Sequence, residues 1–197
     1  RVGISIQTGD VAYELLLSAN TGDTLNGVAG GTEWSRLFIS GELVIFRCVV
    51  ANATWIVEHD GRIAQKGVLR LSTAPSATET AGAVTHPTDL SGAWTADVDV
   101  GNVTVVASDR LTFRRAGTYT VFWYGESVNS ITDAQWFGAG FEVNDTTIIN
   151  AMRVSTGQTI TTMCTGAQSY KAAADDFIRY QYRSSQGSKG LGAKAEA

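Results

Sequence analysis

Amphipathic-helix periodicity is almost absent from this chain of 197 residues, and its absence limits the possible folds more than any other feature. No stretch long enough for an ordinary helix repeats apolar residues at helical spacing. Short runs of β-branched and aromatic residues recur instead, separated by turns rich in Gly, Asn, Asp and Thr. The sequence therefore predicts an all-β protein made of short antiparallel hairpins.

The composition suits strands and turns and narrows the possible partners. Charged residues make up 17% of the chain, and Gly contributes 21 residues. The formal net charge is −4, and the chain lacks the Lys/Arg cluster that a nucleic-acid partner would need to neutralise its phosphates. The longest apolar run, Leu43–Phe46, is far shorter than the roughly 20 residues of a membrane-spanning helix. We expect neither nucleic-acid binding nor membrane insertion.

A change in composition divides the chain into two parts. Both prolines, Pro75 and Pro87, lie in a Ser-, Thr- and Ala-rich segment without apolar periodicity. Proline cannot donate a hydrogen bond to a sheet, so this segment is expected to run extended between two sheets. The predicted organisation is a small antiparallel β module over residues 1–72, a linker over residues 73–88 and a β-sandwich over residues 89–197.

Each part contains a series of expected strands. Those of the first part are Val2–Ile6, Val11–Leu17, Arg36–Ile39, Leu43–Ala51, Thr54–Glu58 and Gly67–Ser72. Those of the second part are Trp94–Val100, Val103–Ala107, Arg110–Arg114, Gly117–Ser127, Ala134–Val143, Thr146–Val154, Gln158–Cys164 and Asp176–Arg183. The Asp60-Gly61 pair predicts a tight turn after the strand that begins at Thr54.

The residue patterns of two expected strands in the second part indicate which of their faces are covered. In Tyr119–Tyr124 both faces are apolar or aromatic, which indicates a strand covered on one side by a second sheet and on the other by a neighbouring subunit. Phe177–Arg183 alternates instead. This alternation places Ile178, Tyr180 and Tyr182 on one face and Arg179, Gln181 and Arg183 on the other.

The residue types that enzymes require are scarce. His59 and His86 lie in turn and linker sequence without other ligands at metal-binding spacing, so both are expected to be solvated. Cys48 and Cys164 lie in different parts and are expected to be buried and unpaired. No nucleophile elbow or phosphate-binding glycine loop occurs. We expect no catalytic residue, no cofactor and no transition metal.

Acidic clusters are the remaining candidates for chemistry. Asp97 with Asp99, or Asp175 with Asp176, could form the paired carboxylates of a polysaccharide hydrolase. Asn144-Asp145 and the Asp97–Asp99 stretch could supply oxygen ligands to calcium, and the sequence leaves this open. The first pair lies on a predicted strand and the second at a strand start, where Asp ordinarily is solvated or forms a turn. We therefore expect structural roles for these carboxylates.

Ordered motifs in the second part indicate a family. Arg110–Phe113 is followed by Ala116–Val121, and Ala173–Asp176 leads into the alternating run Phe177–Tyr182. In this order they resemble the trimeric jelly roll shared by tumour-necrosis-factor-like cytokines, complement globular heads and many bacteriophage fibre and capsid-appendage tips. The resemblance covers residues 89–183 and implies a jelly-roll β-sandwich behind the small β module.

The aromatic residues add an expectation about assembly. They gather in the second part, where one sandwich is not expected to bury all of them, and aromatic side chains are enriched at subunit interfaces. Together with the resemblance, this predicts a homotrimer. Its interface is expected to contain Phe137, Phe141, Tyr180 and Tyr182 around the axis.

The resemblance also implies a function. Residues 1–72 look like the β modules that precede such heads in phage appendages, which implies a non-enzymatic virion surface protein, a head or tail fibre that attaches to the host. Expected partners are other virion proteins and a glycan or protein receptor, with Tyr124, Asn129, Asp133 and Trp136 facing the receptor. The first part would attach to the particle. The alternatives are a capsid decoration protein and a secreted cytokine-like trimer.

Overall fold

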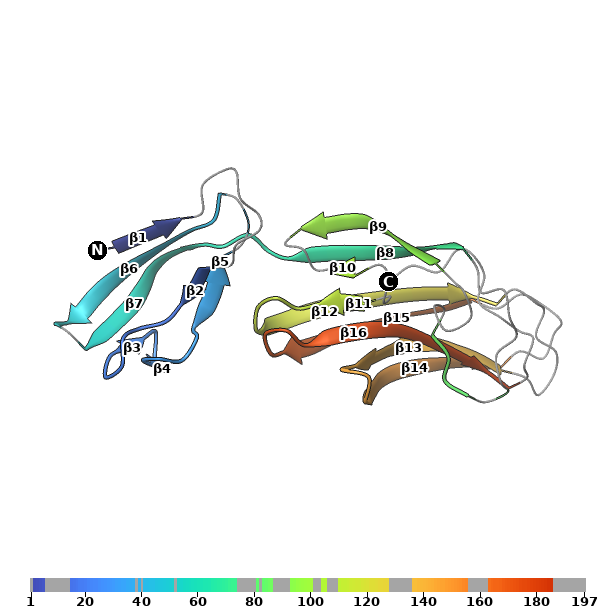
Figure 1. Ribbon diagram of the computed structural model, residues 1–197. Coiled ribbons are helices and arrows are strands. Elements are labelled where there is room, and N and C mark those ends of the chain that lie inside the picture. Colours follow the sequence, from blue (N-terminus) through green and yellow to red (C-terminus); the bar gives the residue numbers. More distant parts are fainter. Residues whose placement is uncertain are drawn as a thin grey trace. The chain divides into compact units, whose positions relative to one another are not determined.

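The protein is described by a computed structural model (Figure 1), in which the regular elements are β-strands. It describes residues 2–5, 15–37, 39, 41–51, 53–73, 81, 83–86, 93–100, 104–105, 110–127, 136–155 and 163–185. The all-β prediction is confirmed. Within these ranges no helix is long and apolar enough to cross a membrane. The chain divides into two compact units, Arg1–Gln65 and Lys66–Ala197.

The first unit is a small antiparallel β module. Its strands are β1 (Val2–Ser5), β2 (Leu15–Leu17), β3 (Thr24–Leu25), β4 (Val28–Ala29), β5 (Ser35–Leu37), β6 (Leu43–Val50) and β7 (Thr54–Gly61). Five of them form a sheet in the order β1-β6-β7-β3-β4, in which only the β3–β7 pairing is parallel, and β2 pairs with β5. The core consists of Leu17, Leu25, Leu37, Val44 and Phe46.

The predicted Asp60-Gly61 turn is wrong. Strand β7 continues through both residues, which pair with Val44 and Leu43 of β6. The Asp60 carboxylate instead accepts a hydrogen bond from Nε of Arg62 at 2.8 Å. An Asp-Gly pair is a turn signal only where the neighbouring strand also ends, and β6 extends far enough here to keep both residues in the sheet.

A buried carboxylate joins the two ends of this module's central hairpin. Glu42 is fully buried, and its Oε2 accepts a hydrogen bond from the Ile39 amide at 3.0 Å. Its Oε1 accepts another from the Ile63 amide at 2.9 Å. Because a buried charge is costly unless it is hydrogen-bonded, these two backbone donors explain how the carboxylate is tolerated.

The second unit is a jelly-roll β-sandwich, as predicted. Its strands are β8 (Lys66–Thr73), β9 (Ala93–Val100), β10 (Thr104–Val105), β11 (Arg110–Thr112), β12 (Gly117–Glu126), β13 (Trp136–Val143), β14 (Thr147–Ser155), β15 (Met163–Ala172) and β16 (Phe177–Ser184). A five-stranded sheet has the order β10-β11-β16-β13-β14, and β12–β15 and β8–β9 form two further pairs. Among the described residues of this unit every strand pairing is antiparallel.

The boundary between the units lies earlier than the sequence predicted. Strand β8 pairs with β9, and its Leu69 and Leu71 are each 1% exposed in the core of the second unit. The described part of the expected linker also belongs to this unit, because Thr85 and Tyr182 exchange backbone hydrogen bonds of 2.9 and 3.0 Å. Periodicity alone could not show that the strand before the Pro-containing segment pairs with the strand after it.

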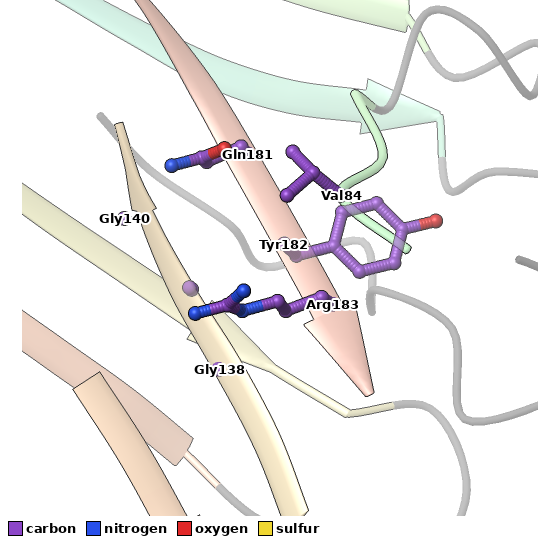
Figure 2. A pocket seen from close by; sticks show the side chains of 7 residues that line it. Val84, Gly138, Gly140, Gln181, Tyr182 and Arg183 are labelled. Atoms are coloured by element: carbon purple, nitrogen blue, oxygen red, sulfur yellow. The ribbon is translucent and has the colours of Figure 1, made fainter. Parts of the chain in front are cut away.

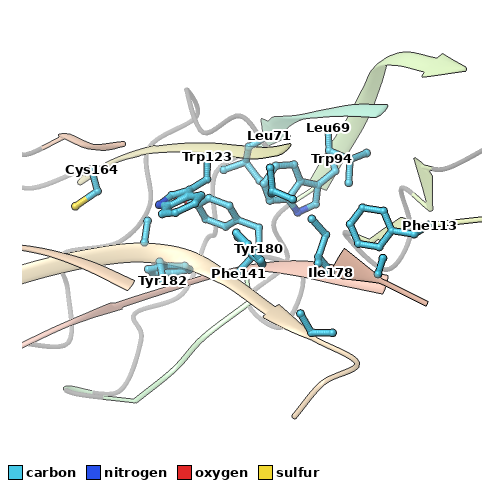
Figure 3. Close-up of a cluster of buried hydrophobic side chains, with 14 of the residues drawn as sticks. Leu69, Leu71, Trp94, Phe113, Trp123, Phe141, Cys164, Ile178, Tyr180 and Tyr182 are labelled. Atoms are coloured by element: carbon cyan, nitrogen blue, oxygen red, sulfur yellow. The ribbon is translucent and has the colours of Figure 1, made fainter. Parts of the chain in front are cut away.

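A cluster of aromatic rings fills the sandwich (Figure 3). Three of the ring pairs that pack there are Trp94 with Tyr180 at 5.5 Å, Trp123 with Phe141 at 5.3 Å, and Phe137 with Tyr182 at 6.2 Å between ring centres. The tryptophans come from β9 and β12 and their partners from β16 and β13. The rings therefore join the smaller strand pairs to the five-stranded sheet.

This core contradicts the trimer interface predicted from the sequence. Phe137, Phe141, Tyr180 and Tyr182 are each at most 2% exposed within one subunit. A second copy therefore finds no surface on these rings to bury. Alternation along β13 and β16 directs the four side chains into the sandwich, and the sandwich is large enough to enclose them.

One glycine makes room for the central tryptophan. Gly166 on β15 lies directly opposite Trp123 on β12. A Cβ atom built on Gly166 would lie 2.0 Å from Cζ2 of the indole, much closer than any real contact. The absence of a side chain at this position lets the indole lie flat across the neighbouring strand.

We predict that Gly166→Ala destabilises the second unit by about 1–3 kcal/mol, because the added methyl group displaces the indole from a close-packed core. Urea denaturation followed by tryptophan fluorescence measures this effect. Gly117→Ala on β12 is the matched control, because its Cβ would lie 3.4 Å from its nearest neighbour, an ordinary contact. Equal stability of the two variants would contradict the packing described here.

We also predict that residues 66–197 fold alone, whereas residues 74–197 do not. The shorter fragment lacks Leu69 and Leu71, and loss of a buried Leu side chain costs about 2–5 kcal/mol, against about 5–15 kcal/mol for the stability of a whole domain. Circular dichroism during heating distinguishes the fragments. A cooperative transition at the same temperature in both would place the boundary after residue 73.

Candidate functional site

The pair β12–β15 presents a flat outer face with little charge. Side chains alternate between the two faces of a strand. Val121 and Trp123 point into the core, so the side chains at the alternate positions of β12, and those paired with them on β15, point outwards. The outward side chains are Thr118, Thr120, Phe122 and Tyr124 on β12, and Thr165, Ala167, Ser169 and Lys171 on β15. We call these eight residues the β12–β15 outer face. Of the eight, only Lys171 is charged.

Phe122 lies at the middle of this face. It pairs with Ala167, and 66% of its surface is exposed. A small neighbour on β15 leaves the ring unshielded, and the Thr and Ser residues around it carry no charge that a partner would have to desolvate. Such a face can bind a second apolar surface, and it offers no group suited to bond-breaking chemistry.

The predicted receptor-facing residues do not come together. Tyr124 lies on the β12–β15 outer face, where its hydroxyl donates a hydrogen bond to Glu126 Oε2 at 3.3 Å. Trp136 lies on β13, in the other sheet, and its amide donates to Ser185 Oγ at 2.9 Å. Each points away from the sandwich on its own sheet. Asn129 and Asp133 lie outside the described residues.

One member of each predicted acidic pair, Asp97 and Asp176, makes structural contacts. Asp97 accepts a hydrogen bond from Nε of Arg70 at 2.7 Å across the β8–β9 pair. Asp176 accepts three hydrogen bonds, from Nδ2 of Asn144 at 2.8 Å, the hydroxyl of Tyr170 at 2.9 Å and the amide of Ala173 at 2.8 Å. These bonds fix the turn that leads into β16.

The hydrogen bond from Asn144 is the largest influence on the Asp176 carboxyl and lowers its pKa below the ordinary 3.8. The bonds from Ala173 and Tyr170 act in the same direction, and partial burial opposes them. The ionised carboxylate is therefore the form that fits this turn.

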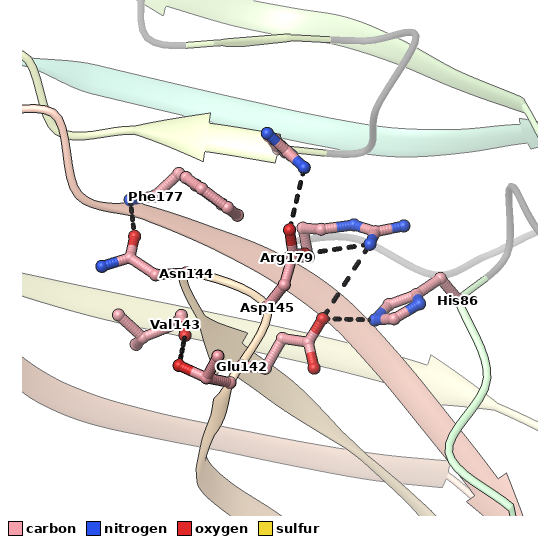
Figure 4. Close-up of polar contacts among 9 residues, drawn as sticks. His86, Glu142, Val143, Asn144, Asp145, Phe177 and Arg179 are labelled. Atoms are coloured by element: carbon pink, nitrogen blue, oxygen red, sulfur yellow. Dashed lines mark hydrogen bonds and ion pairs between the residues drawn. The ribbon is translucent and has the colours of Figure 1, made fainter.

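Arginine side chains contact the carboxylate of the Asn144-Asp145 turn (Figure 4). Asp145 accepts hydrogen bonds from Arg110 and Arg179, each at 3.0 Å. Partial burial alone would raise the pKa of Asp145, but the Arg179 hydrogen bond and the charges of both arginines outweigh it and lower the pKa. Two guanidinium groups neutralise this carboxylate, so it is poorly suited to calcium. Within the described ranges no group of three His, Cys, Asp or Glu side chains could hold a metal ion.

His86 is not solvated, contrary to the sequence prediction. Its Nε2 lies 2.6 Å from Oε1 of Glu142, and the two side chains are 15% and 10% exposed. Arg179 approaches the same oxygen at 4.0 Å. The backbone pairing of Thr85 with Tyr182 carries His86 over β16 towards β13, a contact between distant segments that periodicity cannot show.

The two cysteines are free thiols in different units. Cys164 is buried, as predicted, and burial raises the pKa of its thiol to about 11, so the thiol stays protonated and unreactive. Cys48 is only half-buried, and its sulfur donates a hydrogen bond to the Val50 carbonyl at 3.0 Å.

No family model matches the chain, and no curated protein matches it. Among solved structures it is similar to murine APRIL, with 14% sequence identity and a TM-score of 0.40. The match covers 66% of this chain and 95% of that one.

We predict that Asp176→Asn destabilises the second unit at neutral pH but not in acid. Because the folded-state pKa lies below the ordinary 3.8, the stabilisation is present above pH 3.8 and is lost as the pH falls through the folded-state value. Denaturant unfolding of both proteins between pH 2 and 7 measures the difference. A difference that stays constant over this range would contradict the assigned role.

Proposed function

We propose that this chain is a non-enzymatic virion structural protein, a trimeric surface appendage of a bacteriophage particle that mediates attachment to the host. The observation that carries the proposal is Phe122, 66% exposed on the β12–β15 outer face, where Lys171 is the one charged residue. The virion setting rests on the sequence resemblance of both halves to phage appendage proteins.

The chemistry of the β12–β15 outer face favours self-association. Interface cores are depleted of charge and enriched in aromatic residues, and Phe122 with Tyr124 meets both conditions. Burial of an exposed Phe side chain is worth about 1.5–3 kcal/mol for each copy. Closed symmetry would bury one such face from every subunit without leaving another exposed, and the resemblance to trimeric jelly rolls gives the number of copies as three.

The absence of catalysis is supported by what the acidic groups do. Asp97, Asp145 and Asp176 each hold an arginine or a turn in place. Such carboxylates stabilise the fold, whereas a glycoside hydrolase needs two carboxyl groups that face a common substrate.

The two units would then have separate roles in attachment to the particle and in contact with the host. The first unit would attach to the particle, since it exposes apolar side chains that include Leu16 at 56% and Val50 at 53%. The second unit would project outward and present its surfaces to the host. Binding of residues 1–65 to particles that lack the protein, without binding by residues 66–197, would support this polarity. The opposite result would reverse it.

We predict that Phe122→Lys converts the assembly to monomers without unfolding it, because three lysines cannot share one desolvated face. Sedimentation equilibrium measures the mass, and circular dichroism checks the fold. Val98→Lys is the matched control, because Val98 is also an exposed apolar residue, at 39%, on β9 of the same unit. A wild-type chain that is monomeric at micromolar concentration, or a trimeric Phe122→Lys variant, would overturn the proposed assembly.

A further inference from the structure

The central hairpin of the first unit has an edge that its own sheet covers only in part. Strand β7 pairs with β6 from Leu43 to Val50, whereas β1 pairs only with its first half, residues 43–46. In Figure 1 β6 extends beyond the start of β1. Within the described residues no strand lies beside residues 47–50 on that side. We call this stretch the open edge of β6.

Three exposed valines border the open edge. Val49 and Val50 belong to it and are 45% and 53% exposed. Val2, which pairs with Phe46 just before the open edge begins, is 48% exposed. Proline and charged residues are the ordinary protection of a free sheet edge, and residues 47–50 contain only Arg47 of these types. The side chains here therefore favour a further strand.

The backbone of this stretch also suits pairing. Alternate amides and carbonyls of an antiparallel strand point to each side, so some of them face the open side of β6. The Val50 carbonyl accepts hydrogen bonds from the Ala53 amide at 3.1 Å and from the Cys48 sulfur at 3.0 Å. The ladder for a partner is therefore offered by residues 47–49.

The second unit covers a similar gap with its own chain. There β11 pairs with residues 177–179 of β16, and beyond β11 Thr85 exchanges backbone hydrogen bonds with Tyr182. Figure 2 shows this segment, marked by Val84, beside β16. No described segment of the first unit covers the open edge of β6 in this way, so the edge is accessible to another polypeptide.

We propose that the open edge of β6 accepts an extended strand of the particle protein to which the first unit attaches, in line with β1 and antiparallel to β6. The backbone ladder requires a strand, and the valines favour β-branched apolar residues in it. The register of the β6–β7 ladder shifts between Cys48 and Val50, which increases the local twist and limits the added strand to a short segment. The choice of a particle protein rests on the proposed function of the first unit.

Arg47 adds a charge requirement to this partner. Its side chain is 52% exposed and lies 4.0 Å from Glu58. An acidic residue at the matching position of the added strand would complement it. A second copy of the chain could pair its own open edge here, but that arrangement would bring two Arg47 side chains close together.

Hydrogen exchange of the full chain, free and bound to particles that lack it, tests whether a strand is added. We expect the open-side amides of residues 47–49 to exchange at least about tenfold more slowly in the bound protein, because a hydrogen-bonded ladder must open before its amides exchange. Binding through side chains alone would leave these exchange rates unchanged and would overturn the inference.

Cys48 provides a second measurement at the same edge. Its thiol is half-buried, whereas Cys164 is buried and burial raises the pKa of its thiol to about 11, so a maleimide reports on Cys48. We expect Cys48 to be labelled at least about tenfold more slowly on the particle. Equal labelling rates in the free and bound protein would count against coverage of the edge.

A variant separates the open edge from the rest of the first unit. Val49→Glu places a negative charge beside the expected acidic residue of the partner without removing a buried side chain, so it should weaken binding to the particles at least about tenfold while thermal unfolding stays unchanged. Ile63→Glu is the matched control. Ile63 is also an exposed apolar residue of this unit, at 37%, and it follows the end of β7 that pairs with Leu43, at the other end of β6.

The outcomes distinguish this inference from the proposed function. Particle binding that Val49→Glu leaves intact would overturn strand addition alone and leave attachment to the particle in place. A full chain that does not bind the particles would overturn both. Slower exchange at residues 47–49 that depends on protein concentration without particles would assign the edge to a second copy and overturn the particle protein as its occupant.

Discussion

The second unit depends on the packing of two tryptophans between its sheets. Trp94 and Trp123 come from the two short strand pairs, and each contacts a ring of the five-stranded sheet, Tyr180 or Phe141. Among the described residues the smaller pairs share no strand ladder with the larger sheet, so these side-chain contacts position them against it. The same packing uses the inward side chains of β12 and leaves Phe122 on the opposite face. The candidate surface is thus a direct consequence of the core.

Strands with clear alternation were predictable, and those without it were not. The runs around Leu43, Gly117 and Phe177 were placed nearly correctly, because each alternates or carries β-branched and aromatic residues. Strand β15 was expected to end at Cys164 but continues to Ala172. Its outward residues are small and polar, which gives no apolar period to detect. The two-residue strands β3 and β4 are too short for any pattern.

The site was partly predictable for a related reason. Apolar residues on both faces of Tyr119–Tyr124 predict a second covered face. Phe122 on the β12–β15 outer face is 66% exposed within one subunit, so its covering by a neighbouring subunit stays a prediction. The choice of interface rings was wrong because the sequence does not reveal how much aromatic volume a sandwich can enclose. Contacts such as His86 with Glu142 depend on tertiary pairing and carry no local signal.

The account depends most on whether the β12–β15 outer face is covered by other copies of the chain. A high-resolution structure of the purified protein in its solution oligomer tests this most directly. The account predicts three copies around one axis, with Phe122 buried between subunits and Phe137, Phe141, Tyr180 and Tyr182 inside each sandwich. An oligomer in which Phe122 remains in solvent while another surface forms the contact would contradict it.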